Sequence, residues 1–137
     1  MPRAGWAHAF WTRRGSVTVE YAFILPVLLL FVLGIMDTGR LIWTYTTLNR
    51  AAEAAARCAA VDTVTCGTVT ATQSYAVTQA YGLNVDTTAF TPSTAACGAR
   101  VAATYTFQFT IPWIGGAPYG TSNSTALTAT ACYPPSH

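Results

Sequence analysis

The residues that suggest chemistry lie near the N-terminus, where one carboxylate, Glu20, stands at the entrance to a long apolar run. A charge in an apolar environment is costly unless a specific partner holds it. Hydrolysis of the chain after Gly15 would leave Ser16 as a new N-terminus that carries an ammonium group, with Glu20 as the fifth residue. In an assembly of packed helices, the Glu20 carboxylate of one subunit could then neutralise the Ser16 ammonium of its neighbour, so that neither charge remains unpaired.

A simpler role for Glu20 is also open. If the helix begins at Ser16 or Val17, Glu20 lies near its first turn, where an acidic side chain is favoured by the helix dipole. The sequence alone supports both roles, a helix-stabilising acid and a charge that pairs with a neighbouring subunit.

The element that must position these residues is the apolar run that follows them. Residues 16–43 are long enough to cross a bilayer as a helix, which takes about 20 apolar residues. Arg13 and Arg14, on the N-terminal side, predict that the N-terminus is cytoplasmic and that the rest of the chain lies outside. Residues 1–15 therefore form a short basic leader.

The position of the apolar run also indicates where the chain could be cleaved. A secretory signal carries its small-residue cleavage site after the apolar segment, and no such site follows Met36 at once. If cleavage occurs, it is expected before the apolar run, and Gly15 is the obvious residue to precede it.

The helical pattern continues beyond the membrane segment into an amphipathic part, residues 44–60. One helix from about Val17 to Ala60 would be roughly 65 Å long. Residues that recur at three- and four-residue intervals predict the stripe that packs on the protein's own outer domain. They are Leu41, Tyr45, Leu48, Ala52, Ala55 and Ala59.

Residues 61–137 predict a small outer domain with mixed secondary structure. Gln73–Tyr81 is compatible with a short helix. Apolar and polar residues alternate over Ala99–Ile111 and again over Ser124–Tyr133, which is typical of half-buried strands. The Gly- and Pro-rich segment Pro112–Pro118 separates them, so the strands are expected to form an antiparallel hairpin. The predicted fold class is α+β.

The four cysteines all follow the apolar run, and an even number on an oxidising side of a membrane favours two disulfides. In the hairpin, Cys97 falls near Cys132, and Cys58 with Cys66 would close the end of the long helix onto the next turn. This is one of three possible connectivities, and free thiols in a cytosolic domain are the alternative.

Composition argues against several classes of function. Charged residues make up 9% of the chain, there is no lysine, and four arginines face five carboxylates after Gly15, so no basic stripe is available for nucleic acid. The two histidines, His8 and His137, lie at the ends of the chain, which leaves no Ser–His or Cys–His pair for the predicted domain. No metal site, no cofactor and no enzymatic activity are expected.

The N-terminal residues resemble a known family. Gly15 followed by four residues and Glu20-Tyr21 is similar to the cleavage motif of type IV prepilins, in the form found in the Flp pilins of tight-adherence (Tad) systems. The apolar run from Ala22, its exit Gly34-Ile35-Met36-Asp37-Thr38-Gly39-Arg40, and the Ala-rich helix at 51–57 resemble the TadE-like family. The resemblance extends from about Arg13 to Ala60.

The resemblance implies a minor pilin or pseudopilin with a pilin-like fold. A prepilin peptidase would cut between Gly15 and Ser16, and Glu20 and Tyr21 would act in assembly. The expected partners are other pilins, the pilus assembly platform and inner-membrane lipid, with the protein held as a single-pass inner-membrane protein before it enters an extracellular pilus. The length of the chain and its outer domain favour a minor subunit over the shaft protein. The alternative is an unprocessed single-span membrane protein whose outer domain binds a ligand or partner.

Overall fold

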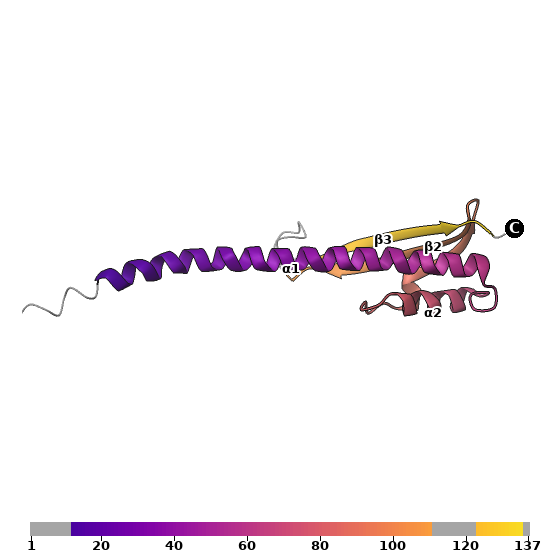
Figure 1. Ribbon diagram of the computed structural model, residues 1–137, viewed down its shortest axis with the longest axis horizontal. Helices are drawn as coiled ribbons and strands as arrows, with labels where there is room; N and C mark the ends of the chain where they lie inside the picture. The colour runs from indigo at the N-terminus through magenta and orange to yellow at the C-terminus, as the bar shows by residue number, and fades with distance from the viewer. Residues whose placement is uncertain (1–11, 111–122, 136–137) are drawn as a thin grey trace, which may run out of the picture. The chain divides into compact units, whose positions relative to one another are not determined.

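The computed structural model describes residues 12–110 and 123–135, with side chains from Val17 onward. Its elements, in chain order, are the long helix α1 (Thr12–Val61), α2 (Val69–Gln79), a short 3-10 helix η1 (Thr87–Ala89) and the strands β1 (Phe90–Ala95), β2 (Gly98–Gln108) and β3 (Ser124–Tyr133) (Figure 1). The chain divides into two compact units, Met1–Met36 and Asp37–His137. An α+β fold with a long N-terminal helix and an antiparallel hairpin is therefore confirmed.

In the first unit, the described residues form one helical segment with no other element. Long aliphatic and aromatic side chains dominate it, and α1 continues through Pro26. From Val17 to Met36, every residue except the half-buried Gly34 is exposed. Exposed apolar area costs roughly 25 cal/mol per Å² in water, so this surface is suited to an apolar environment such as a membrane.

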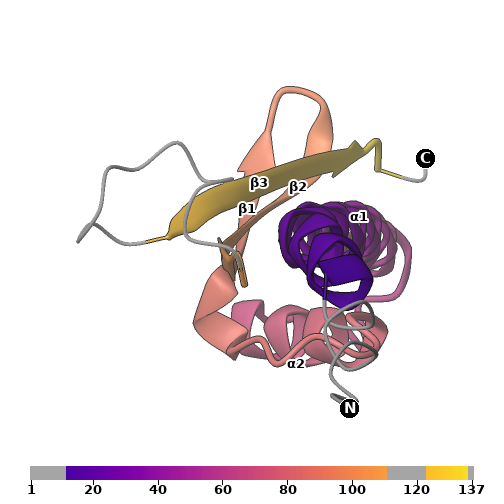
Figure 2. The ribbon, with the colours of Figure 1, turned by 90° about the vertical axis from the view of Figure 1, so that its left-hand side faces the viewer.

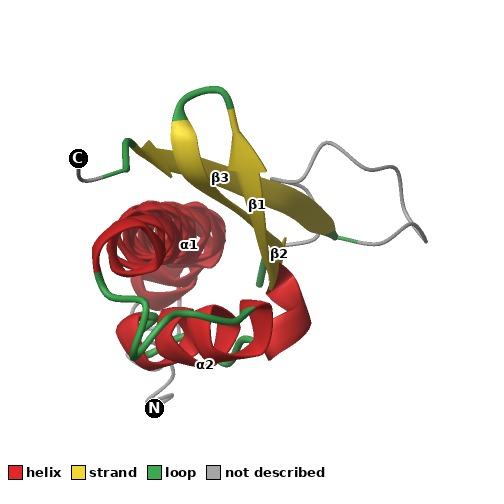
Figure 3. Cartoon of the chain, turned by 90° about the vertical axis from the view of Figure 1, so that its right-hand side faces the viewer, coloured by secondary structure: helices red, strands yellow, loops and turns green. Residues whose placement is uncertain are grey.

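In the second unit, the rest of α1 and the helix α2 lie on the same face of the sheet (Figure 2). Seen from the opposite end, α1 lies toward β3 and α2 lies nearer β1 (Figure 3). The Gln73 side chain donates to the Phe90 carbonyl at 2.8 Å and joins α2 to the start of β1. The core combines residues of both helices and all three strands, and its largest apolar members, Phe90, Leu48 and Val101, are fully buried.

The helix face that packs on the domain is close to the predicted stripe, but it also includes Ala51 and Ala56, which were not predicted. Leu48, Ala52 and Ala55 are buried as expected, and small alanines let the helix approach the sheet closely. Tyr45, however, is 49% exposed, and Thr44 is buried in its place. The Thr44 hydroxyl donates to the Arg40 carbonyl at 2.8 Å, which satisfies its polar group inside the domain.

The sheet has three antiparallel strands in the order β1-β2-β3. The predicted pairing of the last two strands is confirmed, with Ala99 opposite Tyr133 and Gln108 opposite Ser124. The strand β1 was not predicted, because its short sequence is mostly polar and contains Pro92. The predicted loop Pro112–Pro118 lies outside the described residues.

The helix α2 begins four residues before the predicted start. Thr68 caps it, since its side chain accepts a hydrogen bond from the Ala71 N–H at 3.2 Å. The buried Thr72 hydroxyl donates to the Cys66 carbonyl at 3.0 Å and ties the first turn of α2 to the preceding loop.

Candidate functional site

The predicted cleavage and assembly residues lie at the start of α1. Arg13, Arg14, Gly15 and Ser16 belong to the helical backbone, and their side chains are outside the described set. Glu20 follows Ser16 by four residues on the same helix, about 6 Å further along its axis. The structure therefore places the predicted cleavage point within a helical segment and Glu20 about one turn beyond it.

Glu20 and Tyr21 are both exposed, Tyr21 by 65%. Glu20 is the single charged residue of 17–36, and the apolar side chains that follow it are exposed as well. A carboxylate on an otherwise apolar, exposed helix is open to a partner of positive charge. Among the described residues, α1 is the helix long and apolar enough to cross a membrane.

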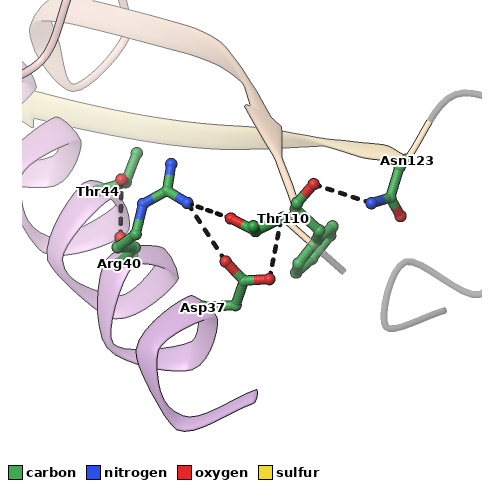
Figure 4. A network of polar contacts seen from close by, with 6 residues as sticks. Asp37, Arg40, Thr44, Thr110 and Asn123 are labelled. Atoms are coloured by element: carbon green, nitrogen blue, oxygen red, sulfur yellow. Dashed lines mark hydrogen bonds and ion pairs between the residues drawn. The ribbon is translucent and has the colours of Figure 1, made fainter. Parts of the chain in front are cut away.

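The second unit holds a polar cluster that the sequence analysis did not predict. Asp37 is 1% exposed, and its Oδ2 accepts a hydrogen bond from the Thr110 N–H at 2.9 Å (Figure 4). Its Oδ1 lies 3.3 Å from Nη1 of Arg40, one helical turn further on. The same Nη1 donates to the Thr110 hydroxyl at 2.9 Å. These three residues form the Asp37 cluster, which ties α1 to the chain just after β2.

Aromatic rings surround the Asp37 cluster. The Arg40 guanidinium carbon lies 5.5 Å from the centre of the Phe107 ring, within the range of a cation–π contact. Phe107 and Phe109 meet edge to face with their ring centres 5.1 Å apart. Asn123 continues the ladder beyond β3, because its carbonyl accepts from the Phe109 N–H and its side-chain amide donates to the Phe109 carbonyl, each at 2.9 Å.

The spacing of Asp37 and Arg40 in the sequence could have predicted the ion pair within this cluster. An acid followed three residues later by an arginine places both side chains on one helix face. By its position in the sequence, Asp37 is simply the first charged residue after the apolar run. Its partner Thr110 is 73 residues away, and no local pattern predicts such a contact.

The structure brings the cysteines together in two pairs. Cys58 is bonded to Cys66 at the end of α1, and Cys97, in the turn between β1 and β2, is bonded to Cys132 of β3, with Cα atoms 5.7 and 6.2 Å apart. These are the two pairs expected from the sequence.

The turn inside the first disulfide is ordered by Asp62. Its Oδ1 accepts from the backbone N–H groups of Val64 and Thr65, each at 3.0 Å. The hydrogen bond from the Thr65 side chain, followed by the backbone bonds, holds the pKa of Asp62 below its usual value.

Within the described residues, no group of three His, Cys, Asp or Glu side chains is arranged to hold a metal ion. His8 and His137 lie outside the described part of the chain. The geometry that the described residues do offer is structural: a membrane-length helix, a buried polar cluster at the start of the second unit, and a cross-linked small domain.

The comparisons with known proteins agree with the N-terminal pattern. A family model described as TadE-like protein matches residues 15–57, which include the predicted cleavage point, Glu20 and both charged members of the Asp37 cluster. No curated protein and no solved structure matches the chain. Residues 15–57 are therefore similar to the TadE-like family.

Proposed function

Because residues 15–57 are TadE-like, we propose that this protein is a minor pilin or pseudopilin of a tight-adherence type IVb pilus. A prepilin peptidase cuts it between Gly15 and Ser16, and the shortened chain is held in the inner membrane until it joins a pilus. Its contribution to pilus assembly and adhesion is structural.

The observation that carries this proposal is the exposed apolar segment 17–36 of α1 with its one carboxylate, Glu20. Lipid covers the exposed apolar residues 17–36 before assembly, with Arg13 and Arg14 keeping the N-terminus cytoplasmic. In a filament, the helices of other pilins replace the lipid. The Glu20 carboxylate, exposed in the single chain, then pairs with the Ser16 ammonium of a neighbouring subunit, and Tyr21 packs beside it.

The outer domain supports a minor role. Residues 61–137, together with the helix part 44–60, form a disulfide-linked domain that a short shaft pilin does not carry. Such a domain suits a subunit that acts at the tip or in the initiation of a pilus, where it has fewer neighbours to accommodate. The assembly platform and other pilins are its proposed partners.

N-terminal sequencing of the membrane-extracted protein tests the processing step. The expected chain begins at Ser16. A chain that begins at Met1 or Pro2 in cells with an active prepilin peptidase contradicts the proposal and favours an unprocessed membrane anchor whose outer domain binds a ligand.

The Glu20→Ala variant separates cleavage from assembly. We expect it to be cut normally and to enter filaments poorly, because the ammonium of the neighbouring subunit loses its counter-charge. Glu53→Gln, which neutralises an exposed carboxylate in the second unit, is the matched control and is expected to enter filaments normally. If Glu20→Ala enters filaments as well as this control, Glu20 has only the helix-stabilising role.

A further inference from the structure

In the described part of the chain, β3 is an edge strand of the sheet. The strand order leaves β1 and β3 at the two edges, and among the described residues no strand pairs with the outer side of β3. Unpaired N–H and C=O groups on a sheet edge are a template for another extended chain.

The ladder shows which groups of β3 are available. The Phe109 N–H donates to the Asn123 carbonyl, so Phe109 and Asn123 form a hydrogen-bonded pair in the register of β2 and β3. In an antiparallel ladder such pairs alternate with non-bonded ones. Odd-numbered residues of β3 therefore bond to β2, and the N–H and C=O groups of Ala126, Thr128 and Thr130 point away from the sheet.

The two edges of the sheet differ in protection. β1 has only six residues and packs against α2. It also contains Pro92, which lies opposite Val101 at a position that is not hydrogen-bonded to β2. Because proline has no N–H, the outer edge of β1 lacks one backbone hydrogen-bond donor there. β3 has ten residues with no proline and no charged side chain, and its register with β2 is continuous. Proteins commonly block such an edge with prolines, charges or a further strand, and within the described residues β3 has none of these.

A groove of about 570 Å³ adjoins the C-terminal half of this edge. One wall is residues 130–133 of β3, and the other is the α1 surface with Arg50, Glu53 and Arg57. All three charged side chains are exposed. An extended chain placed beside β3 would direct alternate side chains into this groove, where two arginines and one glutamate favour an acidic side chain.

We propose that the outer edge of β3 and this groove bind an acidic, extended segment of a partner protein as an added strand. Backbone hydrogen bonds to Ala126, Thr128 and Thr130 supply the affinity, and Arg50 and Arg57 select acidic side chains.

A second copy of this chain fits the edge less well. β3 carries no acid to meet the arginines of the groove.

The test uses the full chain in lipid nanodiscs and two fluorescent ten-residue peptides, one alternating threonine and glutamate, the other threonine and lysine. Fluorescence anisotropy is expected to show at least about tenfold tighter binding of the glutamate peptide, equivalent to 1.4 kcal/mol. Methylation of alternate peptide nitrogens, which removes their donors, is expected to weaken binding by a similar factor.

Two pairs of variants locate the binding. Thr128→Pro removes an outward N–H and is expected to weaken glutamate-peptide binding about tenfold, whereas Thr128→Val keeps the N–H and the affinity. Arg50→Gln with Arg57→Gln should abolish the preference for glutamate. The proposal would be overturned if neither peptide binds, if both bind equally, or if N-methylation of the peptide leaves its affinity unchanged. Crosslinking between the β3 strands of two copies of this chain would overturn it as well. If Thr128→Pro does not fold, the effect of N-methylation on peptide affinity shows whether backbone hydrogen bonds to β3 are formed.

Discussion

Replacement of Asp37 tests whether the Asp37 cluster holds the second unit together. Its Oδ2 accepts the Thr110 N–H at 2.9 Å, and the side chain is 1% exposed. A hydrogen bond to a charged, buried group contributes roughly 1.5–3 kcal/mol. The ion pair with Arg40 adds about 0–1 kcal/mol, because the arginine side chain is 57% exposed and solvent screens it. Asp37→Ala should therefore cost about 1.5–4 kcal/mol.

Asp37→Asn refines the test. The amide oxygen can still accept the Thr110 N–H, while the negative charge that strengthens this bond and attracts Arg40 is lost. We expect about half of the alanine effect, roughly 1–2 kcal/mol. Glu53→Gln, an acid neutralised at an exposed position of the same helix, is expected to change the free energy of unfolding by less than about 0.5 kcal/mol.

The assay is thermal unfolding of the full chain in detergent, followed by near-ultraviolet circular dichroism of the outer domain. For a domain of about 100 residues, the expected loss for Asp37→Ala corresponds to a fall in Tm on the order of 10 °C or more. Hydrogen exchange should show faster exchange of the Thr110 amide than in the parent. A Tm for Asp37→Ala within the range of Glu53→Gln would refute the proposed role of the cluster.

Three further predictions concern the outer domain. Gly98→Ala should destabilise it by about 1–3 kcal/mol, measured by thermal unfolding, because φ at Gly98 is +117° and an added Cβ would meet the Tyr133 carbonyl. Replacement of Cys97 and Cys132 by serine should cost about 3–4 kcal/mol from the loss of a 35-residue cross-link, and a double variant as stable as the parent would contradict this. Asp62→Asn should make the stability of the outer domain less sensitive to acid, because the pKa of Asp62 is lowered in the folded chain. The Asp62 carboxylate contributes its full stabilisation above the unfolded pKa of about 4, and this stabilisation is lost as the pH falls through the folded pKa. Matching acid titrations of variant and parent would oppose that assignment.

Much of the architecture could be predicted from periodicity. The long helix, the strand at Ser124–Tyr133 and its antiparallel partner all follow from repeats of apolar residues that span ten or more positions. The strand β1 could not be predicted in this way. Its six residues are stabilised by pairing with β2 and by the burial of Phe90, and only the folded domain supplies those contacts.

In the candidate site, too, local features could be predicted from the sequence and long-range contacts could not. The motif Gly15, Ser16 and Glu20 is local, so the sequence alone predicts it and the family match covers it. The role of Asp37 depends on an amide 73 residues away. A charged residue beside an apolar run is most simply interpreted as a membrane boundary, and only the tertiary contact with Thr110 shows that Asp37 also belongs to the outer domain.

Quantitative mass spectrometry of sheared, purified filaments tests the proposal that this chain is a processed minor subunit of a pilus. We expect a chain that begins at Ser16, present at a small fraction of the main subunit and absent from filaments when Gly15 is replaced to block cleavage. Recovery of the chain only from the membrane fraction, with its N-terminus at Met1 or Pro2, would show that the proposal is wrong.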